Sequence, residues 1–331
     1  MRYVLAIIAM LPAIHSSLAY ADGYPVEIKH EYGSAVIDQK PERIVSLSFI
    51  GHDFLLALDE VPVALRYWYG TDPYGVWPWA QDALGDATPI VMQGEIDVER
   101  IAALDPDLIV GQWSGMSARD YALLSQIAPT IGPAQGAEDY GMAWQDMLRV
   151  LGQATGKANK ANQIVNRIET RFADLRDAHL PWQGAGAVMV WAGQVGTFTN
   201  RDIRGQFLEE LGFVVPDAIN EMGSANNFYV LMPPEDISPI DTDLLIWIDA
   251  GGSVPKLHDM PLRPLMRAYQ EGREIYADPL LSAALSHSSP LSLDYALDRL
   301  VPLIEAAIDG DPTTIVPSSE EAGIVRPLNG G

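Results

Sequence analysis

Residues 157–179 read KANKANQIVNRIETRFADLRDAH, a stretch that contains neither glycine nor proline. Its apolar residues recur every three or four positions, at Ala161, Ile164, Val165, Ile168, Phe172 and Leu175. This spacing places them on one face of an α-helix. Gly156 stands just before the stretch and Pro181 just after it. The sequence therefore predicts one uninterrupted helix of about 34 Å, at ~1.5 Å per residue, which is long enough to cross a whole domain face.

The same spaced pattern occurs on both sides of this helix. Residues 99–110 read ERIAALDPDLIV, and residues 235–246 read EDISPIDTDLLI. In each copy a glutamate opens a short helical turn, two aspartates follow at matching positions, and an apolar strand then begins. The identical spacing predicts two similar α/β halves joined by the helix. The alternative is a chance likeness between two αβ units.

Composition limits the classes of partner. The 331 residues are 48% hydrophobic, enough for two domains of ordinary size, and 21 Lys and Arg stand against 44 Asp and Glu, a net charge of -23. Such a charge argues against nucleic acid, an anionic membrane surface or a ligand held by a large basic patch. The chain contains no cysteine, which excludes disulfides, thiolate chemistry and a lipid-anchored cysteine.

The first residues, MRYVLAIIAMLPAIHSSLAYA, have the pattern of a secretory signal peptide. One arginine precedes an apolar run, and Ala19 and Ala21 form a small-x-small cleavage site. The apolar run is too short to span a bilayer comfortably, which disfavours a membrane anchor. We therefore expect a soluble periplasmic protein that is exported by a cleavable signal.

Aromatic residues gather in segments that follow predicted strands. Residues 66–79, RYWYGTDPYGVWPW, hold six aromatics broken up by glycine and proline, so we predict a loop that presents rings to a ligand. Residues 226–229, NNFY, form a second such loop in the other half. Trp113 and Arg119 lie just past the strand at 108–110, where open parallel sheets place ligands. The alternative is that the rings fold over the core of their own lobe.

Catalytic motifs give no support to an enzyme. The chain contains no Gly-x-Ser-x-Gly elbow, phosphate loop or His-Glu-x-x-His motif. An exported hydrolase that uses a pair of acids stays as an alternative without a motif. A second alternative is a metal ion held by His52, His258 or His287, because distant ligands leave no local spacing. We expect a binding protein that has no catalytic residues, metal site or cofactor.

Glu99 and Glu235 occupy matching places in the two copies of the repeat. A carboxylate in the first turn of any helix is favoured by the helix dipole, by about 0.3–1 kcal/mol. The dipole does not explain why the same residue type stands in both halves. Two equivalent acids could bind two symmetry-related basic pockets of a dimeric partner.

Three segments resemble periplasmic ferric-siderophore-binding proteins of ABC importers. They are residues 41–46 (PERIVS), 96–111 (IDVERIAALDPDLIVG) and 288–302 (SSPLSLDYALDRLVP). The segment YGVWPW at 74–79 favours the siderophore branch, and the likeness extends over residues 25–310. The Glu-Arg-Ile to Pro-Asp-Leu motif is shared with cobalamin and haem binders, so haem, cobalamin or a bare metal ion is the alternative ligand.

The resemblance implies two Rossmann-like α/β lobes with parallel sheets, joined by one long helix, with the ligand cleft between them. The expected boundaries are a signal peptide at 1–21, an N-terminal lobe at 22–151, a connector at 152–181, a C-terminal lobe at 182–310 and a flexible tail at 311–331. It also implies little closure of the lobes, and we expect a monomer that meets a dimeric permease.

The resemblance implies roles for single residues. The acids at Glu99 and Glu235 meet arginines of the permease in the family. Expected ligand contacts are Ile50, Trp68, Tyr69, Trp77, Gln93, Trp113, Arg119, Arg204, Phe228, Tyr229 and His287. Hydroxamate binders of the family place an arginine where this chain has Gln93, so its recognition chemistry need not match theirs. Because lysine and arginine are scarce, we expect a near-neutral hydroxamate or mixed chelate in preference to a tris-catecholate.

Overall fold

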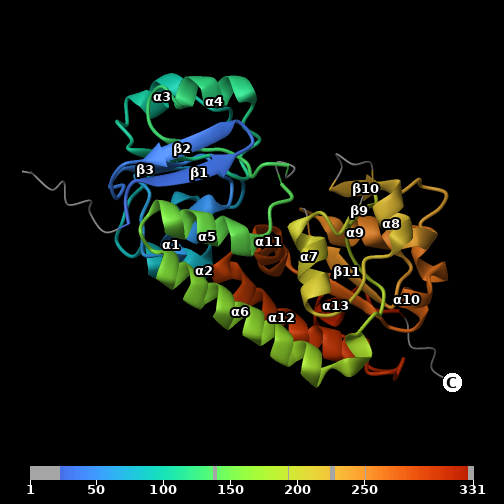
Figure 1. Ribbon diagram of the computed structural model, residues 1–331. Helices are drawn as coiled ribbons and strands as arrows, with labels where there is room; N and C mark the ends of the chain where they lie inside the picture. The colour runs from blue at the N-terminus through green and yellow to red at the C-terminus, as the bar shows by residue number, and fades with distance from the viewer. Residues whose placement is uncertain (1–22, 137–139, 193, 224–227, 250, 327–331) are drawn as a thin grey trace, which may run out of the picture.

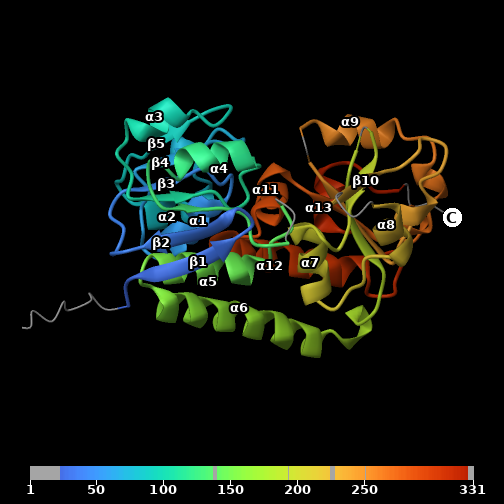
Figure 2. The same ribbon diagram turned by 45° about the horizontal axis from the view of Figure 1, so that its top comes forward.

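The computed structural model describes residues 23–136, 140–192, 194–223, 228–249 and 251–326. Within these residues the chain forms two α/β lobes side by side, with one long helix running beneath both (Figures 1 and 2). Each lobe is built around its own five-stranded sheet. The prediction of two lobes with a helical connector is confirmed. The predicted signal peptide lies outside the described residues.

The N-terminal lobe contains five parallel strands in the order β5-β4-β3-β6-β7. They are β3 Ile44–Ser46, β4 Ala64–Arg66, β5 Ile90–Met92, β6 Leu108–Val110 and β7 Thr130–Ile131. The three central strands are buried at every position, because helices and loops cover both faces of a parallel sheet. The strands β1 (Val26–His30) and β2 (Gly33–Ile37) form a hairpin, which is a separate two-stranded antiparallel sheet.

Short helices connect the strands of this lobe. They are α1 Gly51–Ala57, the 3-10 helix η1 Pro73–Gly75, α2 Pro78–Leu84, α3 Val98–Ala102, α4 Ala118–Leu124 and α5 Trp144–Ala154. The expectation that residues 66–79 contain no helix is wrong at 73–75 and 78–79. Pro78 occupies the first turn of α2, where its fixed φ suits a helix and its missing N–H costs no hydrogen bond.

The sheet of the C-terminal lobe has the order β10-β9-β8-β11-β12. Its strands are β8 Ala187–Trp191, β9 Gly196–Phe198, β10 Tyr229–Leu231, β11 Leu244–Ile248 and β12 Glu274–Ala277. β8, β11 and β12 are parallel, whereas β9 and β10 are antiparallel to their neighbours. The prediction of an entirely parallel sheet is wrong for β9 and β10. The turn between β8 and β9 is too short for a parallel crossover.

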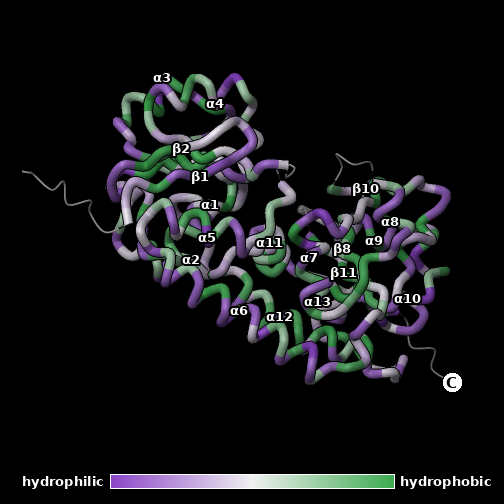
Figure 3. Tube along the Cα trace, viewed as in Figure 1, coloured by the Kyte–Doolittle hydropathy of each residue, from purple (hydrophilic) through white to green (hydrophobic). Residues whose placement is uncertain are grey.

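Helices of the C-terminal lobe surround this sheet. They are α7 Ile203–Glu210, α8 Asp217–Met222, η3 Ser238–Ile240, α9 Ser253–His258, η4 Arg263–Leu265, α10 Arg267–Gln270, α11 Pro279–His287, α12 Pro290–Ala307 and α13 Pro317–Glu321. β11, which is fully buried, lies at the centre of the lobe in the hydrophobic colour (Figure 3). The core of this lobe therefore lies on its three parallel strands.

The connector is α6, Ala158–Ala178, which begins and ends within one residue of the predicted helix. Four members of the predicted apolar stripe are buried: Ala161, Val165, Ile168 and Phe172. At 21 residues and ~1.5 Å per residue, α6 is about 32 Å long. It runs along the underside of both lobes (Figure 2). The stripe of buried apolar residues is therefore the face that α6 packs against the rest of the protein.

A second helix, α12, also bridges the lobes. It packs against α1, α2 and α6 on one side and against α11 and β12 on the other. Arg167 and Arg171 of α6 form ion pairs with Asp294 of α12, at 2.8 and 2.9 Å. The lobes are therefore held together by two helices in contact, where the sequence predicted one.

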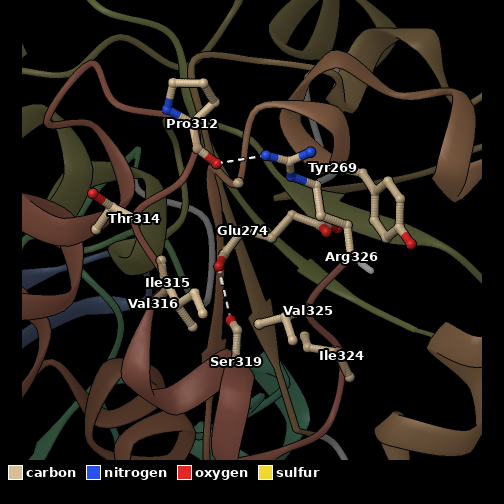
Figure 4. Close-up of a pocket in the computed structure, with 11 residues that line it drawn as sticks. Tyr269, Glu274, Pro312, Thr314, Ile315, Val316, Ser319, Ile324, Val325 and Arg326 are labelled. Atoms are coloured by element: carbon tan, nitrogen blue, oxygen red, sulfur yellow. Dashed lines mark hydrogen bonds between the residues drawn. The ribbon is translucent and has the colours of Figure 1, made fainter. Parts of the chain in front are cut away.

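The C-terminal segment packs on its lobe as far as residue 326. α13 lies against β12, where the Ser319 hydroxyl donates to the carbonyl of Glu274 at 2.7 Å (Figure 4). Ile324 is buried, and its carbonyl accepts a hydrogen bond from Arg263 at 2.5 Å. The sequence predicted a flexible tail at 311–331, whereas residues 311–326 pack on the lobe and bury Val316 and Ile324.

The two copies of the repeat share one structural role. Asp107 precedes β6 and accepts hydrogen bonds from the N–H groups of Glu42 and Arg43, just before the adjacent strand β3. Asp243 precedes β11 and accepts one from the N–H of Gly186, just before the adjacent strand β8. In both lobes the second aspartate of the repeat therefore links, by hydrogen bonds, the segments that precede two paired parallel strands.

Candidate ligand-binding cleft

A cleft of about 800 Å³ lies between the two lobes. Sixteen residues line it: Trp68, Tyr69, Gly70, Thr71, Trp77, Trp191, Phe198, Arg204, Phe228, Tyr229, Ile248, Asp249, Gly251, Pro279, Ser282 and Ser286. The first five belong to the N-terminal lobe and the others to the C-terminal lobe. A volume in the range of ordinary small-molecule sites and a mostly apolar lining make it the candidate site.

The cleft lies at the carboxyl ends of the parallel strands. Trp68 follows β4, Trp191 ends β8 and Ile248 ends β11. Pro279 follows β12 and opens α11. Side chains beyond the carboxyl ends of parallel strands meet at one edge of a sheet, which is where open α/β sheets bind ligands. The topology of each lobe therefore places the carboxyl ends of its parallel strands at the cleft.

Three rings form the N-terminal wall. Trp68 meets Tyr69 edge-on at 4.6 Å between ring centroids, and Tyr69 meets Trp77 at 5.4 Å. Gly70 allows this arrangement: its φ is +107°, and a Cβ at this position would lie 2.8 Å from the Trp77 ring. Trp77 in turn stacks on Trp79 of α2, with 6° between the ring planes. The wall is therefore a packed and rigid aromatic cluster.

Four rings form the facing wall. Trp191, at the end of β8, lies 4.9 Å from the Phe198 ring on β9 and 5.8 Å from the Tyr229 ring on β10. Phe228 lies 5.1 Å from Tyr229. Pairing of β9 with β10 places Phe198 directly opposite Tyr229. The antiparallel half of this sheet therefore builds the second aromatic wall.

Arg204 is the one cation among the lining residues, and its charge is paired. Its Nε and Nη2 donate to the two carboxylate oxygens of Asp202, at 2.6 and 2.8 Å. Asp202 is completely buried and caps the N-terminus of α7. The guanidinium also lies 3.5 Å from the centre of the Phe198 ring. A bidentate pair of this kind fixes the arginine and offsets its charge.

Asp249 is the one acid among the lining residues. Burial by itself would raise the pKa of this carboxyl group, but hydrogen bonds from the hydroxyl of Tyr276 and from Gly251 and Ser253 outweigh it and lower the pKa. The Tyr276 hydroxyl donates to Oδ2 at 2.8 Å, and the Gly251 N–H donates to Oδ1 at 2.7 Å. Asp249 therefore presents a carboxylate to the cleft at neutral pH.

A buried polar cluster lies beneath the N-terminal wall. The His287 ring is in contact with Trp68, Tyr69, Trp77 and Trp79, at 5.3 to 6.0 Å between centroids. Burial lowers the pKa of His287 to about 4, against a smaller opposing effect of the Asp53 carboxyl group. Its Nδ1 lies 2.9 Å from the carbonyl of Ala283 and donates to it. His287 is therefore a neutral ring at physiological pH.

Asp53 of α1 connects this cluster to both lobes. Its Oδ2 accepts hydrogen bonds from the indole N–H of Trp79 and from the hydroxyl of Ser289, each at 2.7 Å. Ser289 caps the N-terminus of α12, the second bridging helix. Asp53 is completely buried. A fully buried carboxyl group with partners on two elements holds the base of the cleft in one arrangement.

The structure brings six of the predicted ligand-contacting residues together in the cleft: Trp68, Tyr69, Trp77, Arg204, Phe228 and Tyr229. Ile50, Trp113 and His287 are 1%, 3% and 1% exposed and lie outside the lining. Trp113 supports Trp68 from behind, at 5.6 Å between ring centroids. Gln93 and Arg119 are exposed, and Gln93 borders a separate small hollow next to Arg66 and Arg100.

Several lining residues were missed by sequence reasoning. Phe198 was missed because it belongs to the short strand β9, which no local pattern indicates. Trp191 was missed because it ends β8 and belongs to no aromatic segment. Asp249 follows an evident apolar strand, so the rule of strand carboxyl ends could have found it. Ser282 and Ser286 lie one turn apart on α11, a helix that was not predicted. The predicted loop residues 226 and 227 lie outside the described residues.

The histidine alternative finds little geometric support. His52 and His287 lie 6.3 Å apart between ring centroids, but both are buried, and His258 ends α9 in the other lobe. Within residues 23–136, 140–192, 194–223, 228–249 and 251–326, no three or more acidic or histidine side chains are grouped so that they could hold a metal ion. Over that same part of the chain, no helix is long and apolar enough to cross a bilayer.

Comparison with known proteins supports this geometry. Residues 44–280, which include most of both lobes, match the family described as periplasmic binding protein. The chain belongs to the periplasmic binding protein family. A periplasmic solute binding protein from Mycobacterium smegmatis resembles this binding protein in structure, with a TM-score of 0.76 and 31% identity over 87% of this chain and 100% of that one.

Two curated relatives carry names that mention siderophores or their iron complexes. The probable siderophore-binding lipoprotein YfiY of Bacillus subtilis (strain 168) is 29% identical over 66% of this binding protein and 67% of its own length. The ferric enterobactin-binding periplasmic protein FepB of Escherichia coli O6:H1 is 29% identical over 65% of this binding protein and 69% of its own length.

Proposed function

We propose that this binding protein captures a ferric siderophore in the cleft between its lobes and delivers it to an ABC importer of the inner membrane. The observation that carries the proposal is the cleft of about 800 Å³ with aromatic walls from both lobes. A siderophore surrounds its iron with organic ligands, so the protein meets a bulky, partly apolar object. Flat aromatic faces and a few polar groups suit such an object.

The lining favours a chelate over bare iron. Among the sixteen lining residues there is one carboxylate, Asp249, and no histidine. Ferric iron needs several oxygen or nitrogen ligands, and a single acid cannot supply them. The iron must therefore arrive with its own ligands. The names of the relatives from Bacillus subtilis and Escherichia coli support the same ligand class for this protein.

Titration of tryptophan fluorescence tests the proposal directly. Trp68, Trp77 and Trp191 line the cleft, so a bound ferric chelate should quench the emission of the purified protein. We expect saturable quenching at micromolar concentration or below by at least one ferric chelate, and no comparable quenching by ferric ions held in a weak buffer. Failure of every hydroxamate, catecholate and carboxylate chelate to bind would refute the proposal.

We further propose that Glu99 and Glu235 dock this protein on the permease. Both side chains are exposed, one on each lobe. Glu99 lies in the first turn of α3, whereas Glu235 stands three residues before η3 and outside a helix. A helix dipole therefore accounts for Glu99 only, and the matching position of Glu235 supports a role in binding basic pockets of a partner.

The double variant Glu99→Ala with Glu235→Ala should leave ligand affinity unchanged and lower iron uptake by about tenfold, because two exposed charge contacts with the permease are lost. Binding is measured by fluorescence, and uptake by transfer of radioactive iron into cells. The control is Glu95→Ala with Glu221→Ala, which removes an exposed acid from each lobe outside the repeat. Equal uptake by the native protein and the first variant would contradict the docking role.

We propose the expected division of the chain for the mature protein as well. Residues 22–151 and 182–310 form the lobes and residues 152–181 the connector, with residues 1–21 removed after export. The contact of α12 with α6 adds support for a nearly fixed angle between the lobes. We propose a monomer that presents both docking acids to one permease dimer.

A further inference from the structure

We infer that the cleft selects ferric chelates of positive or neutral charge, and that Asp249 receives a cationic group of the ligand such as a free ammonium. This inference rests on the proposed function and narrows its ligand class. Three hydroxamates, each with one negative charge, leave ferric iron neutral, and a pendant ammonium makes the complex cationic. Three catecholates, each with two negative charges, leave a strongly anionic complex.

The first argument is that Arg204, the one cation among the described lining residues, is already paired with an acid. Two N–H groups of Arg204 are engaged by the completely buried Asp202, and the guanidinium plane lies on Phe198. The pair is therefore nearly neutral as seen from the cleft. His287, which lies beneath the N-terminal wall, is uncharged at neutral pH because burial lowers its pKa.

The second argument is that Asp249, the acid among the lining residues, keeps its negative charge. Asp249 accepts from the Tyr276 hydroxyl, the Gly251 N–H and, at 3.3 Å, the Ser253 N–H. The Ser253 hydroxyl is a fourth partner, and together these groups hold the carboxyl group in its charged form. An ammonium is attracted to this carboxylate as a point charge, without the need for a vacant acceptor position. Tyr276 and the turn at 251–253 hold the carboxylate in place, half-buried at the cleft edge. It is pre-organised for a cation.

The third argument is the character of the walls. Seven of the sixteen lining residues are aromatic. The face of an aromatic ring is electronegative and attracts cations while it repels anions. Residues 193, 224–227 and 250, which lie outside the described residues next to the lining in sequence, are Gly, Ser, Ala and Asn and carry no charged side chain. The net charge of -23 further disfavours the approach of an anionic complex.

A pair of ligands that differ by one charge tests the inference. The probes are the ferric complex of desferrioxamine B, a linear trihydroxamate with a free amine, its N-acetylated form, and the ferric tris-catecholate of enterobactin. We expect the amine form to bind about tenfold more tightly than the acetylated form, and the tris-catecholate to bind most weakly. Added salt should reduce the preference for the amine form.

Two isosteric variants localise the effect. Asp249→Asn should reduce the difference between the amine and acetylated forms to about twofold or less, because the carboxylate is lost while one acceptor oxygen stays. Asp202→Asn keeps an N-cap for α7 and frees the charge of Arg204, so tris-catecholate affinity should rise about tenfold. Glu320→Gln, on α13 outside the cleft, is the control that removes one acid at a distance and should leave the order of affinities unchanged.

The outcomes separate the inference from the proposed function. Binding of the tris-catecholate more tightly than both hydroxamates would overturn the inference while the siderophore function stands. Equal affinity for the amine and acetylated forms would also overturn it. If no ferric chelate binds, the proposed function itself fails. A cooperative thermal unfolding transition shows that each variant is folded. If Asp202→Asn does not fold, the amine and acetylated forms compared on Asp249→Asn still test the role of Asp249.

Discussion

Replacing Trp68 with alanine is expected to weaken binding of a ferric chelate by about 100-fold, the effect of removing an aromatic residue that contributes about 2–4 kcal/mol at the centre of an interface. Trp68 is half-buried in the N-terminal wall and faces the cleft. Its ring is supported by Tyr69, Trp113 and His287, so it is held in place before a ligand arrives. A rigid ring loses little conformational entropy on binding.

The control for this variant is Tyr74→Ala. Tyr74 belongs to the same aromatic segment, is 39% exposed and is not among the lining residues. Affinity of the Tyr74 variant should stay within about twofold of the native value, as is usual for an exposed residue away from the interface. Both affinities are measured by isothermal titration, because the first variant removes a fluorescent reporter. Similar losses in both variants would show that the segment acts through its fold and not through the Trp68 ring.

The stability of the ligand-free protein should depend on the protonation of His287. Burial lowers the pKa of His287 from an ordinary value of 6.5 to about 4 in the folded protein. Between these two values the unfolded chain binds a proton that the folded chain does not, so unfolding becomes easier as the pH falls. The penalty is absent above about pH 6.5 and complete below about pH 4, and it amounts to about 3 kcal/mol at ~1.36 kcal/mol per pKa unit.

Urea unfolding at pH 7 and pH 4 measures this effect against the variant His287→Asn. Burial also lowers the pKa of His52 in the same cluster, so the comparison is between the pH dependences of the two proteins. Between pH 7 and pH 4 the free energy of unfolding should fall in both proteins, and the fall should be about 3 kcal/mol smaller in the variant. An asparagine amide can still donate to the carbonyl of Ala283, the partner of His287 Nδ1. Parallel pH dependences would contradict the assignment.

Local patterns predicted the elements whose structure depends on near neighbours. The ends of α6 were predicted within one residue because its apolar side chains recur every three or four positions and form a buried stripe. The hairpin of β1 and β2 also has a local pattern, since apolar and polar residues alternate on both sides of a turn at Gly33. In these elements the same residues determine the local conformation and the buried face.

Pairing between distant segments decided the elements that were missed. β9 is short, and its strand conformation depends on hydrogen bonds to β8 and β10 that no local pattern reveals. The role of α12 as a second bridge depends on where α6 lies, which no local pattern reveals. α13 forms in a segment rich in proline, serine and glycine because β12 offers it a surface.

The candidate site divides in the same way. Trp68 and Tyr229 could be predicted as ligand contacts because each belongs to an aromatic segment near a strand end. Gln93 was assigned by resemblance, and Arg119 by resemblance and by its place after the strand at 108–110. The structure places both outside the cleft lining. Trp191 and Asp249 are the reverse case, since each stands at a strand end but lacks a local motif.

The sequence by itself determined the acidic surface, the absence of cysteine chemistry, the stiff connector and the richness in aromatic residues. The tertiary structure alone decided which rings share a cleft and which charges are available there. Asp202 and Arg204 are two positions apart in the sequence, yet whether the arginine faces a ligand as a cation or as half of an ion pair depends on the burial of Asp202. Burial strengthens that pairing because little water remains to compete for either partner.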